Sequence, residues 1–259
     1  MIDTELEQIG RGELEVRRHA AAAGSERRAP LVFLHEGLGS IDLWRTFPDD
    51  VRLEAGSPAT VIYSRHGYGG SAVVDEPRSI EYMHHEADSV LPDLLERLEV
   101  ERPVLIGHSD GASIALLFAG AGRPVAGLVL LAPHVFVEDR SITGIAGARH
   151  AYQHGDLAAR MSRYHRDAEA TFWGWNDVWL SPAFRDWNIE DRLSAIRSPI
   201  LLIQGADDEY GSEAQLDAVE RGVAGRCRRV VVPGVGHSPH LAAPQTTREA
   251  VVEFIGQLD

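Results

Sequence analysis

The chain has 259 residues, of which 44% are hydrophobic and 25% charged, enough apolar material for one sizeable core and too balanced a composition for disorder. Its 39 acidic and 25 basic residues give a formal charge of −14, which argues against binding to nucleic acid or to an anionic membrane surface. All 25 basic residues are arginine, and the absence of lysine excludes P-loop nucleotide hydrolysis, pyridoxal-phosphate Schiff bases and lysine-based aldolases.

The cysteine content and the N-terminal stretch bear on where the protein works. A single cysteine, Cys227, excludes an intramolecular disulfide and a cysteine-rich metal site, and it suits a reducing compartment. Residues 1–7 are acidic and lack the apolar core of a signal peptide, and no later stretch approaches ~18 uninterrupted apolar residues. We expect a cytoplasmic protein of one domain without nucleic-acid or membrane partners, whose oligomeric state the sequence leaves open.

The order of predicted elements indicates the fold class. Alternating polar and apolar residues around Gly10-Arg11-Gly12 predict a β-hairpin from Leu6 to His19. Short apolar runs then predict strands that are buried on both faces, at Leu31–Leu34, Thr60–Tyr63, Val104–Ile106, Leu128–Leu131, Ile200–Ile203 and Val230–Val232. Helical patterns lie between them, near residues 40–54, 79–99, 112–120, 212–221 and 244–257, and the fourth opens on a capping-box pattern from Ser212 to Gln215. Such alternation predicts an α/β fold with a mostly parallel, doubly wound sheet and an antiparallel start.

Residues 134–190 interrupt this alternation. They contain no strand-like run, and four of the five tryptophans lie in the second half of the segment. We interpret the segment as a helical lid inserted between two parts of one core, residues 1–133 and 191–259. Phe172, Trp175 and Trp179 recur at helical spacing, either to bury themselves against the core or to contact substrate. In both cases the cavity beneath is expected to be apolar and to suit an aromatic or medium-length acyl group.

The sequence Gly107-His108-Ser109-Asp110-Gly111 carries the clearest chemical signal. It places G-x-S-x-G between a predicted strand and a predicted helix, the context that a nucleophile elbow requires. Glycines suit this turn because the serine takes a strained conformation and a Cβ on either side would clash. The alternative is a glycine-rich turn of a nucleotide-binding fold, although G-x-G-x-x-G is missing after the first strand.

A nucleophilic serine needs a base and an acid that orients the base. Asp207 and Asp208 follow the predicted strand at 200–203, and His237 follows the one at 230–232. Both loops come at carboxyl ends of parallel strands, the edge where open α/β sheets build their sites. The order of serine, acid and histidine along the chain is that of α/β-hydrolases.

Four segments in this order resemble the α/β-hydrolase family, in particular its compact, lid-bearing esterases and C–C hydrolases, and the likeness covers nearly the whole chain. Besides the serine elbow and the histidine loop at 237–241 (H-S-P-H-L), residues 34–40 (L-H-E-G-L-G-S) are similar to the family's oxyanion loop. Residues 64–71 (S-R-H-G-Y-G-G-S) are similar to the D-x-R-G-x-G-x-S loop. Glu36 stands where the family usually has glycine, and Ser64 and His66 replace the usual aspartate and arginine.

The resemblance implies a serine hydrolase that needs no cofactor or metal and acts on a small molecule. Ser109 would be the nucleophile, His237 the base and Asp208, three residues after Gly205, the orienting acid, with Asp207 as the alternative. The backbone N–H groups of Gly37 and Asp110 would form the oxyanion hole. The residues expected around the substrate are Glu36, Leu38, Trp175, Trp179 and His240, although His240 fits a surface position equally well.

The favoured reaction is hydrolysis of a carboxylic ester or lactone through an acyl-enzyme. Hydrolysis of a C–C bond in a vinylogous diketone, as in hydrolases of meta-cleavage products, remains an alternative, as does a non-enzymatic protein that binds a ligand on this fold. The carboxylate of Asp110 either complements a helix N-terminus or recognises a cationic group of the substrate. His150 and His154 stand four residues apart, but lack the glutamate of a metalloprotease helix and are interpreted as a polar helix face.

Overall fold

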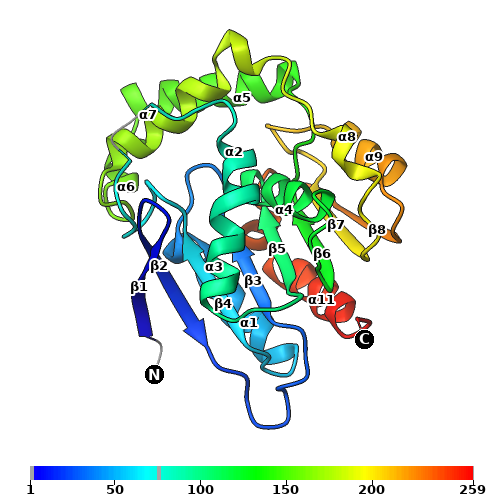
Figure 1. Cartoon of the computed structure of the whole chain (residues 1–259). Helices are drawn as coiled ribbons and strands as arrows, with labels where there is room; N and C mark the ends of the chain where they lie inside the picture. Colours follow the sequence, from blue (N-terminus) through cyan, green and yellow to red (C-terminus); the bar gives the residue numbers. More distant parts are fainter. Residues whose placement is uncertain (1–2, 75–76, 259) are drawn as a thin grey trace.

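The structure is a computed structural model that describes residues 3–74 and 77–258, so Met1 and Ile2 of the acidic N-terminal stretch lie outside it. Within these residues, eight strands form one sheet in the order β1-β2-β4-β3-β5-β6-β7-β8 (Figure 1). The strands are β1 (Asp3–Ile9), β2 (Gly12–His19), β3 (Leu31–Leu34), β4 (Thr60–Ser64), β5 (Val104–His108), β6 (Gly127–Leu131), β7 (Ile200–Gly205) and β8 (Cys227–Val232).

The pairing of the strands confirms the predicted sheet. β1 and β2 form an antiparallel hairpin whose turn includes Gly10 at φ +53°, and β2 also pairs with β4 in antiparallel register. The neighbouring pairs from β4 to β8 are all parallel. The carboxyl ends of these parallel strands therefore meet at one edge of the sheet, and the loops that follow β4, β3 and β5 lie next to one another.

Helices cover both faces of the sheet. In the described part of the chain they are α1 (Phe47–Glu54), α2 (Tyr82–His85), α3 (Leu91–Arg97), α4 (Asp110–Gly120), α5 (Asp139–His154), α6 (Leu157–Met161), α7 (Ala168–Trp179), α8 (Glu190–Leu193), α9 (Glu213–Gly222), α10 (Pro239–Ala242) and α11 (Pro244–Ile255). None of the described helices is both long and apolar enough to span a bilayer.

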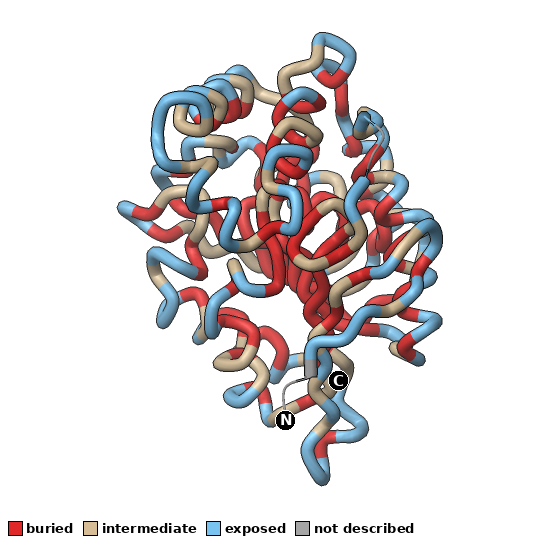
Figure 2. The backbone as a smooth tube through the Cα atoms, turned by 90° about the vertical axis from the view of Figure 1, so that its left-hand side faces the viewer, coloured by how far each residue is buried: buried red, intermediate tan, exposed pale blue. Residues whose placement is uncertain are grey.

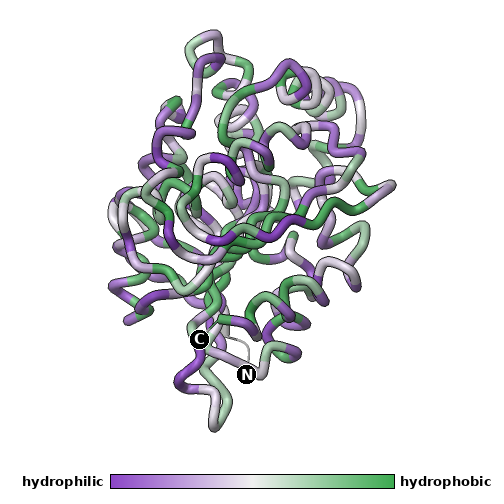
Figure 3. Tube along the Cα trace, turned by 90° about the vertical axis from the view of Figure 1, so that its right-hand side faces the viewer, coloured by the Kyte–Doolittle hydropathy of each residue, from purple (hydrophilic) through white to green (hydrophobic). Residues whose placement is uncertain are grey.

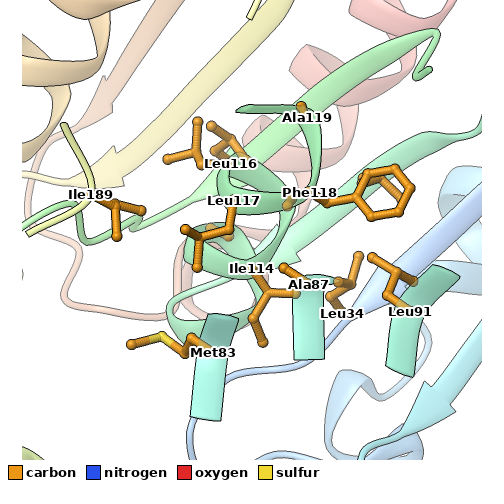
Figure 4. Close-up of a cluster of buried hydrophobic side chains, with 14 of the residues drawn as sticks. Leu34, Met83, Ala87, Leu91, Ile114, Leu116, Leu117, Phe118, Ala119 and Ile189 are labelled. Carbon is orange, nitrogen blue, oxygen red and sulfur yellow. The ribbon is translucent and has the colours of Figure 1, made fainter. Parts of the chain in front are cut away.

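Side chains that alternate along the strands build two apolar cores, one on each face of the sheet. Leu31 and Phe33 of β3 pack with α1 and α11, whereas Val32 and Leu34 face α3 and α4. Figure 4 shows the second core, where side chains of α2 and α3 lie against α4. The central strands are buried along their length and mostly apolar (Figures 2 and 3), as expected for a sheet that is covered on both sides.

The helix predicted at 40–54 is interrupted. A 3₁₀ turn at Ile41–Trp44 precedes α1, and Arg45 between them has φ +56°. A residue in the left-handed region cannot continue a right-handed helix, so the chain turns there and starts again at Phe47. The amphipathic pattern on which the prediction rested spans both pieces, because both contribute buried residues.

The helix predicted at 79–99 is found from Tyr82 to Arg97, with a π-helical segment at Glu86–Val90 in its middle. Pro92 has no N–H to donate to the Asp88 carbonyl four residues earlier, which favours a local widening of the helix. The Asp88 carbonyl instead accepts a hydrogen bond from Arg123 Nη2 at 2.9 Å.

The capping box predicted from Ser212 to Gln215 is wrong in one half. Ser212 Oγ accepts from the Ala214 N–H at 3.2 Å, as a helix cap should. The side chain of Gln215, however, binds residues that follow β6: its Oε1 accepts from Val135 N at 2.8 Å and its Nε2 donates to Phe136 O at 3.1 Å. The buried side chain of Gln215 therefore forms hydrogen bonds with backbone groups of a distant segment, and not with the N–H groups at the start of its own helix.

Residues 134–190, which the sequence analysis interprets as an insertion, contain α5, α6, α7 and a 3₁₀ turn at Pro182–Phe184, and a β-bridge joins Phe136 to Asn188. α5 and α7 lie above the end of the sheet in Figure 1, and α7 places Trp175 and Trp179 next to residues of the β3 and β5 loops. Phe172 is fully buried and stacks on Tyr152, with ring centroids 3.9 Å apart.

Candidate active site

Ser109 occupies a sharp turn between β5 and α4. Its φ of +53° and ψ of −118° lie outside the regions that a serine normally adopts. A Cβ added to Gly111 would lie 2.0 Å from Leu34 O, and one added to Gly107 would lie 2.4 Å from Gly111 O. The two glycines of G-x-S-x-G are therefore required by close backbone contacts, as the sequence analysis expected.

Asp208 and His237 meet in the loops that follow β7 and β8. His237 Nδ1 lies 2.9 Å from Asp208 Oδ1 and 3.0 Å from Oδ2, so the imidazole proton on Nδ1 is directed at the carboxylate. The two loops touch closely, because a Cβ on Gly205 would lie 2.0 Å from Val235 O. Asp207 is exposed and its side chain makes no contact with His237 in the described structure.

The Asp208 carboxylate is held in its ionised form. Burial alone would raise its pKa, but hydrogen bonds from His237 and from Tyr210 N, the latter at 2.8 Å, outweigh burial and hold the pKa below its ordinary value. The carbonyl of Asp208 also accepts from Arg140 Nη1 of α5 at 2.7 Å. The insertion and the acid loop are thus tied together directly.

Ser109 and His237 open onto the same cavity of about 240 Å³. Among the described residues no hydrogen bond joins Ser109 to the imidazole, a separation that is common before substrate binds. The cavity is lined by residues from the connections that follow β3, β5, β6, β7 and β8 and from the helices α5 and α7: Glu36, Gly37, Leu38, His108, Ser109, Asp110, His134, Ser141, Ile145, Trp175, Trp179, Glu209, Tyr210, His237 and Ser238.

The predicted pocket residues Glu36, Leu38, Trp175 and Trp179 all line this cavity, and most of its surface is apolar, as expected. Leu38, Ile145 and the two tryptophans supply apolar surface, whereas the polar groups come mainly from the loops that follow the strands. The periodicity of the aromatic residues predicted part of the apolar surface, but the polar groups lie in loops that have no periodic pattern.

Both interpretations of His240, as a residue around the substrate and as a surface residue, are wrong. It is 3% exposed, so it is not at the surface, and it is absent from the cavity wall. Its ring packs against Trp44, Phe47 and His108, with centroid distances of 4.9, 5.4 and 4.7 Å. Burial lowers the pKa of His240 well below that of a free imidazole, so it behaves as a neutral core residue beneath the site.

Gly37 and Asp110, the two residues expected to form an oxyanion hole, both line the cavity. In the described structure neither the Gly37 N–H nor the Asp110 N–H donates to a protein acceptor. The carboxylate of Asp110, by contrast, faces inward: Oδ2 accepts from Tyr82 OH at 2.6 Å and lies 3.6 Å from Arg65 Nη2. The Asp110 carboxylate therefore has a buried cation, Arg65, as a partner. The sequence analysis had considered only a helix N-terminus or a cationic group of the substrate.

His134, Glu209 and Tyr210 are cavity residues that the sequence analysis missed. His134 lies three residues after Leu131, the last residue of β6, so its place near a strand's carboxyl end was a usable signal. Burial lowers its pKa, and its ring lies 5.8 Å from that of His237. Glu209 and Tyr210 directly follow Asp208, and Glu209 Oε2 accepts from the backbone N–H of His237 at 3.1 Å.

Two other features carry no comparable chemistry. A hollow of about 420 Å³ lies between residues 67–74 and 77–80 on one side and α7 on the other, and its lining contains Ser181 but no histidine among the described residues. His150 and His154 are exposed on α5 with ring centroids 4.8 Å apart. No cluster of three possible metal ligands occurs in residues 3–74 and 77–258.

Comparisons with known proteins agree with this architecture. A family model described as the alpha/beta hydrolase family matches residues 31–250. A proline iminopeptidase of Lactobacillus delbrueckii subsp. bulgaricus is 24% identical over 221 residues, which cover 70% of this chain and 75% of that protein.

Two solved structures share the fold over almost the whole chain. The proline iminopeptidase of Mycobacterium smegmatis superposes with a TM-score of 0.75 at 19% identity and covers 98% of both chains. The enol-lactonase of Burkholderia xenovorans LB400 superposes with a TM-score of 0.73 at 17% identity and covers 98% of this chain and 100% of its own. The family match spans most of the chain, so the protein belongs to the alpha/beta hydrolase family and is, by that membership, a hydrolase.

Proposed function

We propose that the protein is a cofactor-free serine hydrolase that cleaves a carboxylic ester or lactone through an acyl-enzyme. The observation that carries this proposal is the pairing of His237 Nδ1 with the buried Asp208 carboxylate at the cavity onto which Ser109 opens. With Nδ1 protonated and bound to Asp208, Nε2 of His237 is the nitrogen free to take a proton.

In the acylation step, Ser109 Oγ forms a bond to the substrate carbonyl carbon while its proton passes to Nε2 of His237. The carbonyl oxygen becomes an oxyanion that accepts hydrogen bonds from the Gly37 and Asp110 N–H groups. Collapse of this intermediate breaks the C–O bond of the ester, and the imidazolium returns the proton to the leaving alkoxide. Each oxyanion donor typically lowers the barrier by about 2.7–4 kcal/mol.

In the deacylation step, a water molecule attacks the acyl-enzyme and gives its proton to His237. The bond between Ser109 Oγ and the acyl carbon breaks, the proton returns to Oγ, and the free acid leaves. Asp208 stays ionised throughout, because it keeps its hydrogen bonds from Tyr210 N and His237.

The insertion at residues 134–190 acts as a lid in this proposal. Trp175 and Trp179 are among the residues by which it lines the cavity that His237 also lines. Exclusion of water by these side chains strengthens the hydrogen bonds to the oxyanion, since the local dielectric constant falls. The largely apolar lining fits an acyl group of medium length whose reacting carbonyl faces the polar loops.

A fluorophosphonate probe and a chain-length series of nitrophenyl esters test this function. The wild-type protein should turn over a short or medium ester and should be labelled at Ser109, and Ser109→Ala should abolish both. Labelling at Ser113, the next serine of the elbow helix, would refute the assignment. Labelling at Ser109 without any ester turnover would favour C–C bond hydrolysis, and absence of both would favour a ligand-binding protein.

A further inference from the structure

Arg65 is a buried cation that the proposed mechanism does not use. It follows β4 directly, and its side chain is 2% exposed. A guanidinium removed from water requires acceptors and negative charge close by. Its Cζ lies 4.5 Å from the centroid of the Tyr68 ring, and its backbone N–H donates to His35 Nε2 at 3.0 Å.

The first acceptor of Arg65 belongs to the oxyanion loop. Arg65 Nη2 donates to Glu36 O at 2.8 Å, and this carbonyl is part of the same peptide group as the Gly37 N–H. In a trans peptide the C=O and N–H point in opposite directions, so a donor fixed on Glu36 O fixes the direction of the Gly37 N–H. A hydrogen bond to the carbonyl also polarises the peptide and makes its N–H a stronger donor.

Glu36 O has two further donors, which define the orientation of this peptide group. His35 Nδ1 lies 2.7 Å away and Gly39 N lies 3.1 Å away. His35 Nε2 accepts from Arg65 N, so the imidazole is neutral and carries its proton on Nδ1. Burial, followed by the charge of Arg65, lowers the pKa of His35 well below its ordinary value and keeps it in that form.

The second partner of Arg65 is the carboxylate of Asp110, whose backbone N–H is the other proposed donor of the oxyanion hole. Nη2 lies 3.6 Å from Asp110 Oδ2, and the Asp110 carboxylate is 1% exposed. The strand order β4-β3-β5 explains how one side chain reaches both residues, because the loop with Gly37 lies between the Arg65 loop and the serine elbow. Tyr82 OH donates to Asp110 Oδ2 and accepts from Trp179 Nε1 of α7 at 3.0 Å.

We propose that Arg65 is a positioning residue for the oxyanion hole: it orients the Gly37 peptide through Glu36 O and anchors Asp110 through its carboxylate. Its positive charge lies next to the Glu36 carbonyl and the Asp110 carboxylate, and it favours the negative charge that develops on the substrate oxygen. This inference rests on the proposed function. The competing explanation is that Arg65 only neutralises the buried charge of Asp110.

Removal of Arg65 alone cannot separate the two explanations, because it leaves the Asp110 carboxylate buried and uncompensated, which destabilises the fold in either case. The double variant Arg65→Met/Asp110→Asn removes both charges and keeps the Asp110 N–H. If Arg65 is only a counterion, this variant should recover both stability and turnover. If Arg65 positions the oxyanion hole, it should recover stability but not turnover.

The kinetic test uses nitrophenyl butyrate, with 1,1,1-trifluorooctan-2-one as an inhibitor whose serine adduct carries an oxyanion and octan-2-one as its neutral counterpart. For the folded double variant we expect kcat to fall by about 10- to 100-fold, less than the roughly 100- to 1,000-fold that loss of a direct donor costs, with KM within a few-fold of wild type. Affinity for the trifluoroketone should fall in parallel, and affinity for octan-2-one should not change.

Arg78→Met is the matched control, because Arg78 also places its Cζ 4.5 Å from the Tyr68 ring but contacts neither Glu36 nor Asp110. It should leave kcat near the wild-type value. If the double variant does not fold, Arg65→Lys decides. Arg65 Nη2 contacts both partners, and the lysine side chain is one bond shorter, so its ammonium does not reach the position of Nη2 and kcat should fall about tenfold in a folded protein.

Wild-type kcat in the folded double variant, or in Arg65→Lys when the double variant does not fold, overturns the inference, as does an equal loss of affinity for both ketones. These outcomes are distinct from failure of the proposed function, in which the wild-type protein itself neither hydrolyses the ester nor reacts with the fluorophosphonate.

Discussion

Gly37→Ala tests the close contact between the oxyanion loop and the insertion. A Cβ on Gly37 would lie 2.0 Å from Trp175 Nε1, 2.6 Å from Cδ1 and 2.7 Å from Cε2. Carbon atoms in contact lie about 3.5–4.0 Å apart, so the indole or the loop must retreat by about 1.5 Å. Gly37 does not have a positive φ, and the alanine therefore meets no backbone strain besides this clash.

A displacement of this size should be costly for turnover. Misplacement of a reacting group by about 1 Å costs roughly 100-fold in rate, and overpacking typically destabilises by about 1–3 kcal/mol. We expect Gly37→Ala to lower kcat/KM for nitrophenyl butyrate by about 100-fold. It should also lower the free energy of unfolding in urea by about 1–3 kcal/mol. Gly147→Ala is the matched control, because it lies in exposed α5 with no atom within 4 Å of the added Cβ.

The partner in the clash can be identified with a double-mutant cycle. If the alanine strikes the indole, Gly37→Ala should cost less in a Trp175→Leu background, with a coupling of at least about 1 kcal/mol in the free energy of unfolding. Additive effects of the two substitutions would show that Gly37 and Trp175 do not touch. The close contact between the oxyanion loop and Trp175 would then be refuted. An unchanged kcat/KM in Gly37→Ala would refute it more directly.

Three further predictions follow from the site and its surroundings. Asp208→Asn should lower kcat about 10⁴-fold because the amide favours the wrong tautomer of the imidazole, whereas Asp207→Asn should be mild, and the reverse ranking would exclude Asp208 as the acid. Turnover should survive exhaustive chelation by EDTA, since the proposed chemistry uses only side chains and backbone N–H groups; loss of activity that zinc restores would contradict it. Burial lowers the pKa of His35, His134 and His240 below the ordinary 6.5, so the unfolded chain binds more protons than the folded chain as the pH falls below about 6.5. The free energy of unfolding in urea should therefore decrease between pH 7 and pH 5, by up to about 4 kcal/mol per pH unit for three such groups, and a flat profile would show that they are not buried as neutral rings.

The strands were predictable because their sequences follow from a simple physical requirement. A strand covered on both faces must be apolar at every position, and the runs at Leu31–Leu34 and Ile200–Ile203 mark β3 and β7 to within two residues. The loops with Ser109, Asp208 and His237 were predictable for a related reason, since each follows such a run at its carboxyl end.

The contacts between loops were not predictable, because they depend on the spatial order of the strands. Nothing in the sequence states that β3 lies between β4 and β5, yet this order brings Arg65 to both Glu36 and Asp110. The same holds for Gln215, which matches a capping box locally but satisfies the backbone after β6.

The departure of Ser64 from the family pattern shows how such contacts decide which residue a position accepts. Ser64 is fully buried, and its Oγ donates to Glu15 Oε2 of β2 at 2.7 Å. The same carboxylate oxygen accepts from Gly70 N at 2.9 Å, so β2 supplies to this loop the carboxylate that the family usually carries at position 64. An aspartate at 64 would place two carboxylates within about 3 Å of each other in a buried position, where one of them must be protonated. Ser64 and Glu15 therefore have to be considered as a pair, because the familiar residue at 64 fits this loop only if Glu15 is replaced as well.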